Sequence, residues 1–184
     1  MNEKVKDSGS TQEFSTGAHR DNPTGKGRCD LLPLKYVAMV MNDPVLAEIN
    51  AFMEDGNISH LSSAIKHSAK TLDIFHYENI INQLSEDHIF MNVTLVTDNN
   101  KEEILTKCLA HMMLEVSKLY EAGAEKYGEN NWQLGMPVNR YLDSGIRHYL
   151  KTLRGDADEP HYRGFLWNIL CAMWTQDHKS ELKS

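Results

Sequence analysis

The chain has 184 residues, of which 41% are hydrophobic, and its formal net charge at pH 7 is −7. These values predict one soluble domain with a real core and argue against a nucleic-acid polymer as partner. No apolar run reaches the roughly 18 residues that span a membrane, and no signal-peptide core precedes the domain, so we expect no membrane partner and a cytoplasmic location. Cys29, Cys108 and Cys171 are too widely spaced to favour a disulfide framework or a zinc knuckle.

Residues 1–16 are polar, rich in Ser and Thr and without periodicity, which predicts a mobile tail. Residues 17–33 form a loop punctuated by glycine and proline that carries Arg20, Lys26 and Arg28. It is not a Walker A loop, because Gly-Arg rather than Ser or Thr follows its Gly-Lys pair. A flexible cationic loop can still close over phosphates, and an ordinary solvated loop is an equal alternative.

We expect a single domain that covers residues 17–184. Asp43 is expected to cap a helix that begins with Pro44. Residues 90–100, "FMNVTLVTDNN", are rich in β-branched side chains and end in a turn signal, which predicts one short strand.

Three helices with apolar stripes follow, at about residues 101–127, 137–153 and 160–175, and the first two end at Gly128 and Gly155. The predicted fold is therefore an all-α helical bundle with an inserted segment and at most one short strand element. Large side chains off the main stripe, such as Trp167 and Cys171, suggest a second packing surface, and we expect a homo-oligomer, at least a dimer.

Glu121 and Glu125 lie one helical turn apart, opposite the apolar stripe. Such a like-charge pair costs roughly 0.2–0.5 kcal/mol on an isolated helix, which a divalent cation or a basic partner would offset. A solvated face with Lys118 and Lys126 as neighbours is an equally weighted alternative.

Asp143 and Arg147 are also one turn apart and can form a simple ion pair. Alternatively, Arg147 can bind phosphate through its two-pronged guanidinium, while Asp143 holds the arginine in position or binds metal. His148 is expected on the far side of the stripe, where it serves the same pocket only if a second subunit supplies the wall.

Asp156, Asp158 and Glu159 precede the last helix, where carboxylates favour a helix start and could also hold a hard cation. His161 and Asn168 stack on one side of that helix, away from its hydrophobic centre. In "NNW" at 130–132, Asn131 can make paired hydrogen bonds and Trp132 can stack on a base, although a tryptophan there more often packs in the core.

Four stretches together resemble a phage family, the dATP/dGTP diphosphohydrolase N-terminal domain, which is grouped with the all-α MazG-like NTP pyrophosphohydrolases. They are "GKGRCDLLPL" at 25–34, "YEAGAEKYGENNWQLGMP" at 120–137, "YLDSGIRHYLKTLRGD" at 141–156 and "DEPHYRGFLWNIL" at 158–170. The residues that match the family motifs by position are Glu121, Glu125, Lys126, Asn131, Trp132, Asp143, Arg147, His148, Asp158, Glu159, His161 and Asn168.

The resemblance implies a nucleotide-binding fold in which a purine (deoxy)nucleoside triphosphate loses pyrophosphate with Mg²⁺. Its phosphates would meet Arg147, Lys126 and the loop with Arg20, Lys26 and Arg28. The metal would be held by some of Glu121, Glu125, Asp143, Asp158 and Glu159, the first three being the candidate catalytic residues.

Two departures from the family pattern motivate an alternative. The clustered E-E-x-x-E helix of the superfamily is absent, and residues 41–104 are an insertion that the family motifs do not explain. In addition, Gly164 stands where a second histidine is usual. The alternative is a non-catalytic protein, a sponge, that sequesters a signalling nucleotide of host defence in the cytoplasm of an infected bacterium.

Overall fold

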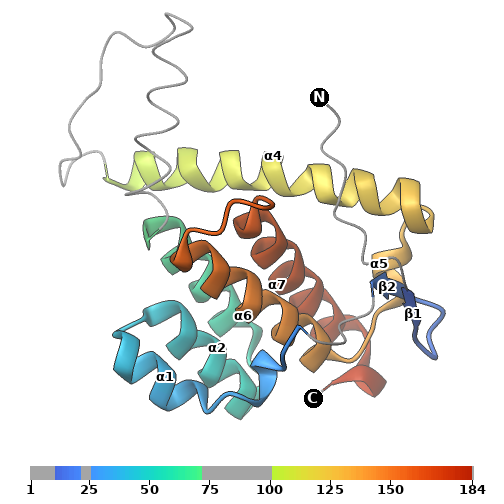
Figure 1. The fold of residues 1–184 in the computed structure, drawn as a ribbon, viewed down its shortest axis with the longest axis horizontal. Helices are drawn as coiled ribbons and strands as arrows, with labels where there is room; N and C mark the ends of the chain where they lie inside the picture. The colour runs from blue at the N-terminus through green and yellow to red at the C-terminus, as the bar shows by residue number, and fades with distance from the viewer. Residues whose placement is uncertain (1–10, 22–25, 72–100, 184) are drawn as a thin grey trace, which may run out of the picture.

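The computed structural model describes residues 11–21, 26–71 and 101–183, the last range without the side chains of 101–104. This part of the chain is helical apart from one small hairpin, as the sequence predicts (Figure 1). In chain order its elements are β1 (Thr11–Glu13), β2 (His19–Asp21), η1 (Cys29–Leu31), α1 (Leu34–Met41), α2 (Pro44–Asp55), a helix over 58–71, α4 (Lys101–Tyr127), α5 (Asn131–Leu134), α6 (Val138–Arg154), α7 (His161–His178) and η2 (Ser180–Leu182).

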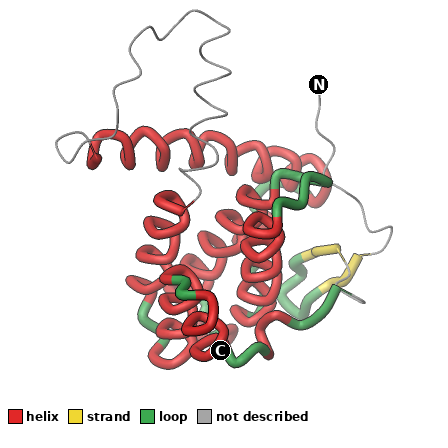
Figure 2. Tube along the Cα trace, turned by 60° about the vertical axis from the view of Figure 1, so that its left-hand side comes forward, coloured by secondary structure: helices red, strands yellow, loops and turns green. Residues whose placement is uncertain are grey.

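Helices α6 and α7 form an antiparallel pair at the centre, and α4 lies across one end of the bundle (Figures 1 and 2). The pair packs closely because Gly145 has no side chain. A Cβ atom there would lie 3.3 Å from Ile169 Cδ1 and 3.4 Å from Asn168 Cβ. The buried apolar side chains of α6 include Tyr141, Leu142, Ile146 and Tyr149, and those of α7 include Phe165, Leu166 and Ile169.

The helix boundaries follow local signals in the sequence. The Asp43 carboxylate accepts a 3.0 Å hydrogen bond from the Leu46 backbone N–H, and Pro44 is the first residue of α2, as predicted. Gly155 ends α6 in the left-handed conformation at φ 82°. None of the described helices is long and apolar enough to cross a membrane.

The hairpin corrects one prediction in part. Residues 11–16 were assigned to the mobile tail, yet β1 pairs antiparallel with β2, and Gly17 closes the turn with φ 81°. The strands have only three residues each, which is too short to show a periodic pattern, so they could not be predicted from the sequence. The strand predicted over 90–100 lies outside the described residues.

The described part of the predicted insertion shares the core of the bundle. Leu46, Ile49 and Phe52 of α2 are fully buried, and Leu61 and Ala64 of the 58–71 helix are buried as well. Residues 43–71 therefore pack into the same hydrophobic core as α6 and α7.

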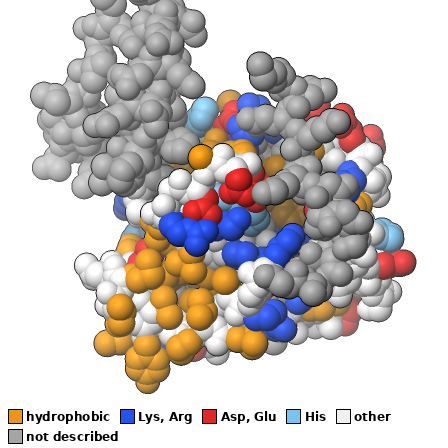
Figure 3. Space-filling model, in the orientation of Figure 1, with side chains coloured by type: hydrophobic (Ala, Val, Ile, Leu, Met, Phe, Trp, Pro, Cys, Tyr) orange, Lys and Arg blue, Asp and Glu red, His pale blue; other side chains and the backbone are white. Residues whose placement is uncertain are grey.

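The side chains that suggested an oligomer are accounted for within one chain. Cys171 is fully buried, and Trp167 packs against Tyr120 and Tyr141 at ring-centroid distances of 6.1 and 6.0 Å. That reason for expecting an oligomer was wrong, and the assembly itself stays a prediction. A different apolar surface is exposed around α1, in the lower left of Figure 3, with Tyr36, Met39 and Val40 more than half exposed.

Replacing Phe52 tests whether α2 belongs to the cooperative core. We expect Phe52→Ala to lower the free energy of unfolding by about 3–5 kcal/mol, because it leaves a cavity in a fully buried site. Val40→Ala, at a position that is 87% exposed, is the control and should change it by less than about 0.5 kcal/mol. Urea unfolding measures both, and equal midpoints for parent and Phe52→Ala would show that α2 is not part of the core.

Candidate functional site

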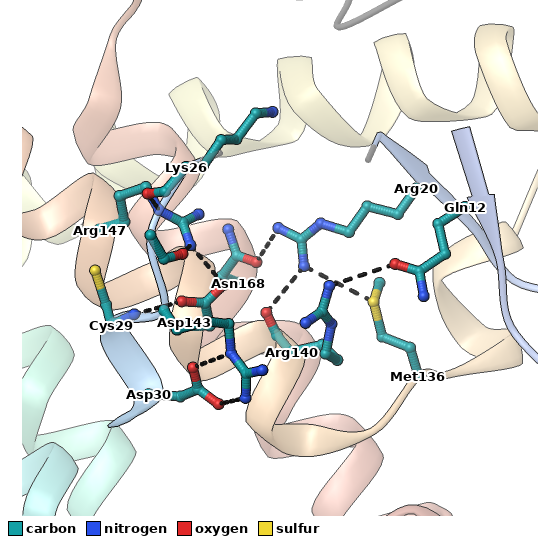
Figure 4. Close-up of polar contacts among 12 residues, drawn as sticks. Gln12, Arg20, Lys26, Cys29, Asp30, Met136, Arg140, Asp143, Arg147 and Asn168 are labelled. Atoms are coloured by element: carbon teal, nitrogen blue, oxygen red, sulfur yellow. Dashed lines mark hydrogen bonds and ion pairs between the residues drawn. The ribbon is translucent and has the colours of Figure 1, made fainter. Parts of the chain in front are cut away.

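Arg20 reaches from β2 into the space between the start of α6 and the middle of α7 (Figure 4). Its Nη2 donates to Asn168 Oδ1 at 2.8 Å, and its Nη1 donates to the Arg140 carbonyl at 3.2 Å. The guanidinium carbon lies 5.9 Å from the centre of the Trp167 ring. These contacts fix the direction of the guanidinium but supply no negative charge.

The surroundings of Arg20 are short of negative charge. None of its hydrogen bonds within the described part of the chain is to a carboxylate. Burial lowers its pKa, and the positive charges of Arg147 and Arg140 act in the same direction. An arginine stays protonated in proteins, so the site holds a partly buried cation whose natural complement is an anion.

Asp143 and Arg147 of α6 hold the basic loop in place. Arg147 Nη2 donates to Asp143 Oδ2 at 2.5 Å, and the Cys29 backbone N–H donates to Asp143 Oδ1 at 2.6 Å. Arg147 also donates to the carbonyls of Lys26 and Gly27, at 2.8 and 2.9 Å. The pair is therefore more than an exposed intrahelical ion pair, because Asp143 is only 2% exposed and both of its oxygens accept hydrogen bonds.

The three predicted loop cations have different surroundings. Arg20 is partly buried, whereas Lys26 and Arg28 are exposed. Arg28 makes a paired contact with Asp30, Nε to Oδ1 at 2.7 Å and Nη2 to Oδ2 at 2.5 Å. This contact lowers the pKa of Asp30. Lys and Arg side chains gather beside acidic ones at the centre of this face (Figure 3).

Sequence reasoning missed Arg140, which faces the same cluster and donates to Gln12 Oε1 at 3.3 Å. Helical spacing could have found it, because Arg140 precedes Arg147 by seven residues, or two turns of α6.

Lys126 and Asn131 position the hairpin that carries Arg20. The Lys126 ammonium lies 2.9 Å from Asp21 Oδ1. The Asn131 side chain accepts from the His19 backbone N–H at 3.2 Å and donates to the His19 carbonyl at 3.3 Å. An open hollow of about 360 Å³ lies here, lined by Thr11, His19, Lys126 and Tyr127.

Trp132 packs among aromatic side chains. Its ring meets those of Tyr120 and Trp174 edge to face, at centroid distances of 5.4 and 5.3 Å. This geometry is typical of core aromatics and favours packing over stacking on a base.

Glu121 and Glu125 are exposed on α4, and neither has a hydrogen bond or ion pair within the described residues. The structure does not bring them to Arg20, Arg140 or Arg147. Their predicted roles in catalysis and metal binding stay predictions.

His148 faces His161 of α7 in the same chain, rather than a wall supplied by a second subunit. Its Nδ1 is 3.0 Å from Nδ1 of His161 in the same chain, so no second subunit is needed to bring the two rings together. Gly164 makes this possible, because a Cβ atom there would lie 2.8 Å from atoms of the His148 ring. Burial lowers the pKa of His148 to about 3, and the nearby guanidinium groups of Arg20 and Arg147 act in the same direction. The ring is therefore neutral near pH 7.

The two polar residues of α7 that were singled out from the sequence are buried. His161 and Asn168 were expected away from the hydrophobic centre, yet they are 3% and 2% exposed because that side of α7 packs on α6. His161 Nε2 is 2.8 Å from Asp158 Oδ1, and His161 Nδ1 is 3.2 Å from Glu159 Oε1. Asp156 instead pairs with Arg154 at 2.5 Å.

Asn168 connects the histidine cluster to the arginine cluster. It accepts a hydrogen bond from Arg20, and its Nδ2 donates to the Gly164 carbonyl at 2.6 Å. Gly164 in turn contacts the His148 ring. The two clusters therefore lie side by side along the α6–α7 pair.

Residues 94–184, just under half of the chain, match the model of a family described as dATP/dGTP diphosphohydrolase, N-terminal. The match confirms the resemblance drawn from the motifs at 120–170 and does not extend to the basic loop or to α2. Comparison with curated proteins and with solved structures gives no match.

Arg147→Ala tests the loop attachment. We expect it to lower the free energy of unfolding by about 3 kcal/mol, because it leaves the buried Asp143 carboxylate without its counter-charge. Hydrogen exchange at residues 26–29 should also become faster. Arg154→Ala, which breaks an exposed pair with Asp156, is the control and should leave both measurements unchanged. Unchanged exchange in Arg147→Ala would show that the loop is held by other contacts.

Proposed function

We propose that the protein binds a purine (deoxy)nucleoside triphosphate and hydrolyses it with release of pyrophosphate, in the presence of Mg²⁺. The observation that carries the proposal is the Arg20 guanidinium, partly buried and fixed by hydrogen bonds, with no carboxylate among its described partners. The family name, dATP/dGTP diphosphohydrolase, supplies the substrate class.

The arginine cluster suits a chain of phosphates. Arg20 and Arg140 offer N–H donors between the hairpin and α6, and Arg147 adds a third positive charge. Lys26 and Arg28 lie on the attached loop at the edge of the cluster. Because phosphoryl transfer depends mainly on positioning and on stabilising negative charge, such a fixed set of donors is the main requirement.

Asp158 and Glu159 are the predicted metal ligands that border this cluster. Glu159 Oε1 is 3.7 Å from His148 Nδ1, and His148 lies within the electrostatic influence of Arg20 and Arg147. Mg²⁺ commonly takes one or two carboxylates and completes its shell with phosphate oxygens and water. A bound Mg²⁺ would neutralise phosphate charge, and one or both of these carboxylates would suffice to hold it once nucleotide is present.

One observation favours the alternative, a sponge that sequesters a signalling nucleotide of host defence. Both oxygens of Asp143 accept hydrogen bonds, and no described contact links Glu121 or Glu125 to the arginine cluster. The cluster could therefore bind phosphates without the three candidate catalytic residues.

Incubation with a panel of nucleotides distinguishes the two functions. With Mg²⁺, the hydrolase should convert dATP or dGTP to the monophosphate and pyrophosphate, and EDTA should stop the reaction. Glu125→Gln should slow turnover if that carboxylate holds metal, and should leave it unchanged if the residue belongs to a solvated face. Tight binding that EDTA does not weaken, with recovery of intact nucleotide by chromatography, would replace the hydrolase with the sponge.

Arg20→Met tests the anion site itself. We expect a roughly 10- to 100-fold loss of triphosphate affinity, because a hydrogen bond to a charged group is worth about 1.5–3 kcal/mol. Unfolding without ligand should change little, because the lost hydrogen bonds are offset by removal of a buried charge. Arg154→Met, at an arginine already paired with Asp156, is the control. Calorimetry measures affinity, and full affinity in Arg20→Met would remove Arg20 from the site.

A further inference from the structure

Three potential metal ligands converge where α6, the loop before α7 and the first turn of α7 meet. They are His148 Nδ1, His161 Nδ1 and Glu159 Oε1. The two nitrogens are 3.0 Å apart, and the carboxylate oxygen is 3.2 Å from His161 Nδ1 and 3.7 Å from His148 Nδ1. The His161 side chain is only 1% exposed, so its ring is held by the surrounding protein.

The hydrogen bonding of His161 leaves a lone pair at the centre of this triangle. His161 Nε2 faces Asp158 Oδ1 at 2.8 Å, which places the proton of a neutral ring on Nε2. Nδ1 then carries a lone pair and faces the Glu159 carboxylate, which is also an acceptor. Two acceptors at 3.2 Å repel each other unless a cation, or a proton such as that of a neutral His148 Nδ1–H, lies between these three atoms.

We propose that His148, Glu159 and His161 bind one divalent transition-metal ion of the Zn²⁺ class. Zinc–nitrogen distances of about 2.05 Å in a tetrahedral site separate neighbouring ligand atoms by about 3.3 Å. The three observed separations, 3.0, 3.2 and 3.7 Å, surround this value. Two imidazoles and one carboxylate form a set that suits Zn²⁺, Co²⁺ or Ni²⁺, whereas Mg²⁺ prefers oxygen ligands. The ion differs in class from the Mg²⁺ of the proposed reaction, and because it would occupy Glu159, that Mg²⁺ would be held by Asp158 together with phosphate oxygens and water.

The surroundings of the triangle are those of a metal site. The Asp158 contact to His161 Nε2 is the usual way in which a ligating imidazole is oriented and its metal-binding nitrogen made more basic. Gly164 gives the His148 ring its place against α7, at a helix-interior position where glycine costs about 1 kcal/mol relative to alanine. His148 and Glu159 are 22% and 31% exposed, so a fourth ligand can enter from solvent.

The test uses the whole chain without nucleotide, so its outcome is independent of the proposed reaction. The protein is stripped with a chelator, dialysed against Zn²⁺ or Co²⁺, and measured by elemental analysis, Co²⁺ visible absorption and thermal unfolding. We expect one ion per chain, visible Co²⁺ bands, a raised Tm, and no displacement by excess Mg²⁺.

Variants assign the ion to the cluster. Glu159→Gln and His148→Ala should weaken or abolish binding, and Asp158→Asn should weaken it about 10- to 100-fold. Glu159 is part-exposed, so its variant should fold normally. The matched control is His60→Gln. His60 contacts two carboxylates as well, Glu48 at 2.7 Å and Asp55 at 3.2 Å, but through opposite ring nitrogens, so its ligands do not converge.

Three results would overturn the proposal. In the first, the parent protein binds no ion and its Tm does not change when metal is added. The cluster would then be held by a doubly protonated His161 that donates to both Asp158 and Glu159. Binding that survives both His148→Ala and Glu159→Gln would place the ion elsewhere. An equal loss in His60→Gln would show that the ion does not depend on this triangle.

Discussion

The ion pair between Asp143 and Arg147 connects the helical core to the part of the molecule that faces ligands. One turn of α6 sets the spacing of the two side chains, and burial of Asp143 makes the arginine indispensable to it. The Arg147 guanidinium also donates to the carbonyls of Lys26 and Gly27. The second oxygen of the Asp143 carboxylate accepts from the Cys29 backbone N–H. Two side chains of a helix thus fix residues 26–29, which contain few apolar groups of their own.

The helices were predictable because their causes are local. Apolar periodicity marked α4, α6 and α7, and capping residues such as Asp43 and Gly155 marked boundaries to within a few residues. The hairpin could not be predicted, because it depends on contacts made more than 100 residues away in sequence. Its strands are held by the Asn131 side chain and by the pairing of Asp21 with Lys126.

The candidate site was predictable by residue type but not by arrangement. Arg20, Arg147, His161 and Asn168 were selected from motifs, and the structure places them along one helix pair. The contacts between these side chains could not be predicted from the sequence. Arg20 lies 148 positions from Asn168, and the side of α7 that packs on α6 depends on Gly145 and Gly164. Lys126 and Trp132 show the opposite case, since both fit a ligand role by type but are engaged in packing and hairpin contacts.

The contact between Gly164 and the His148 ring also constrains how this chain can diverge. The ring fills the volume that any side chain at position 164 would need. The two positions should therefore covary in evolution, with a larger residue at 164 tolerated only when 148 is small or turned outward. A homologue with histidine at 164 and a small residue at 148 would keep an imidazole in the same volume while supplying it from α7 instead of α6. Evolution would then conserve the place of the imidazole ring in the fold, rather than the residue type at position 148 or 164.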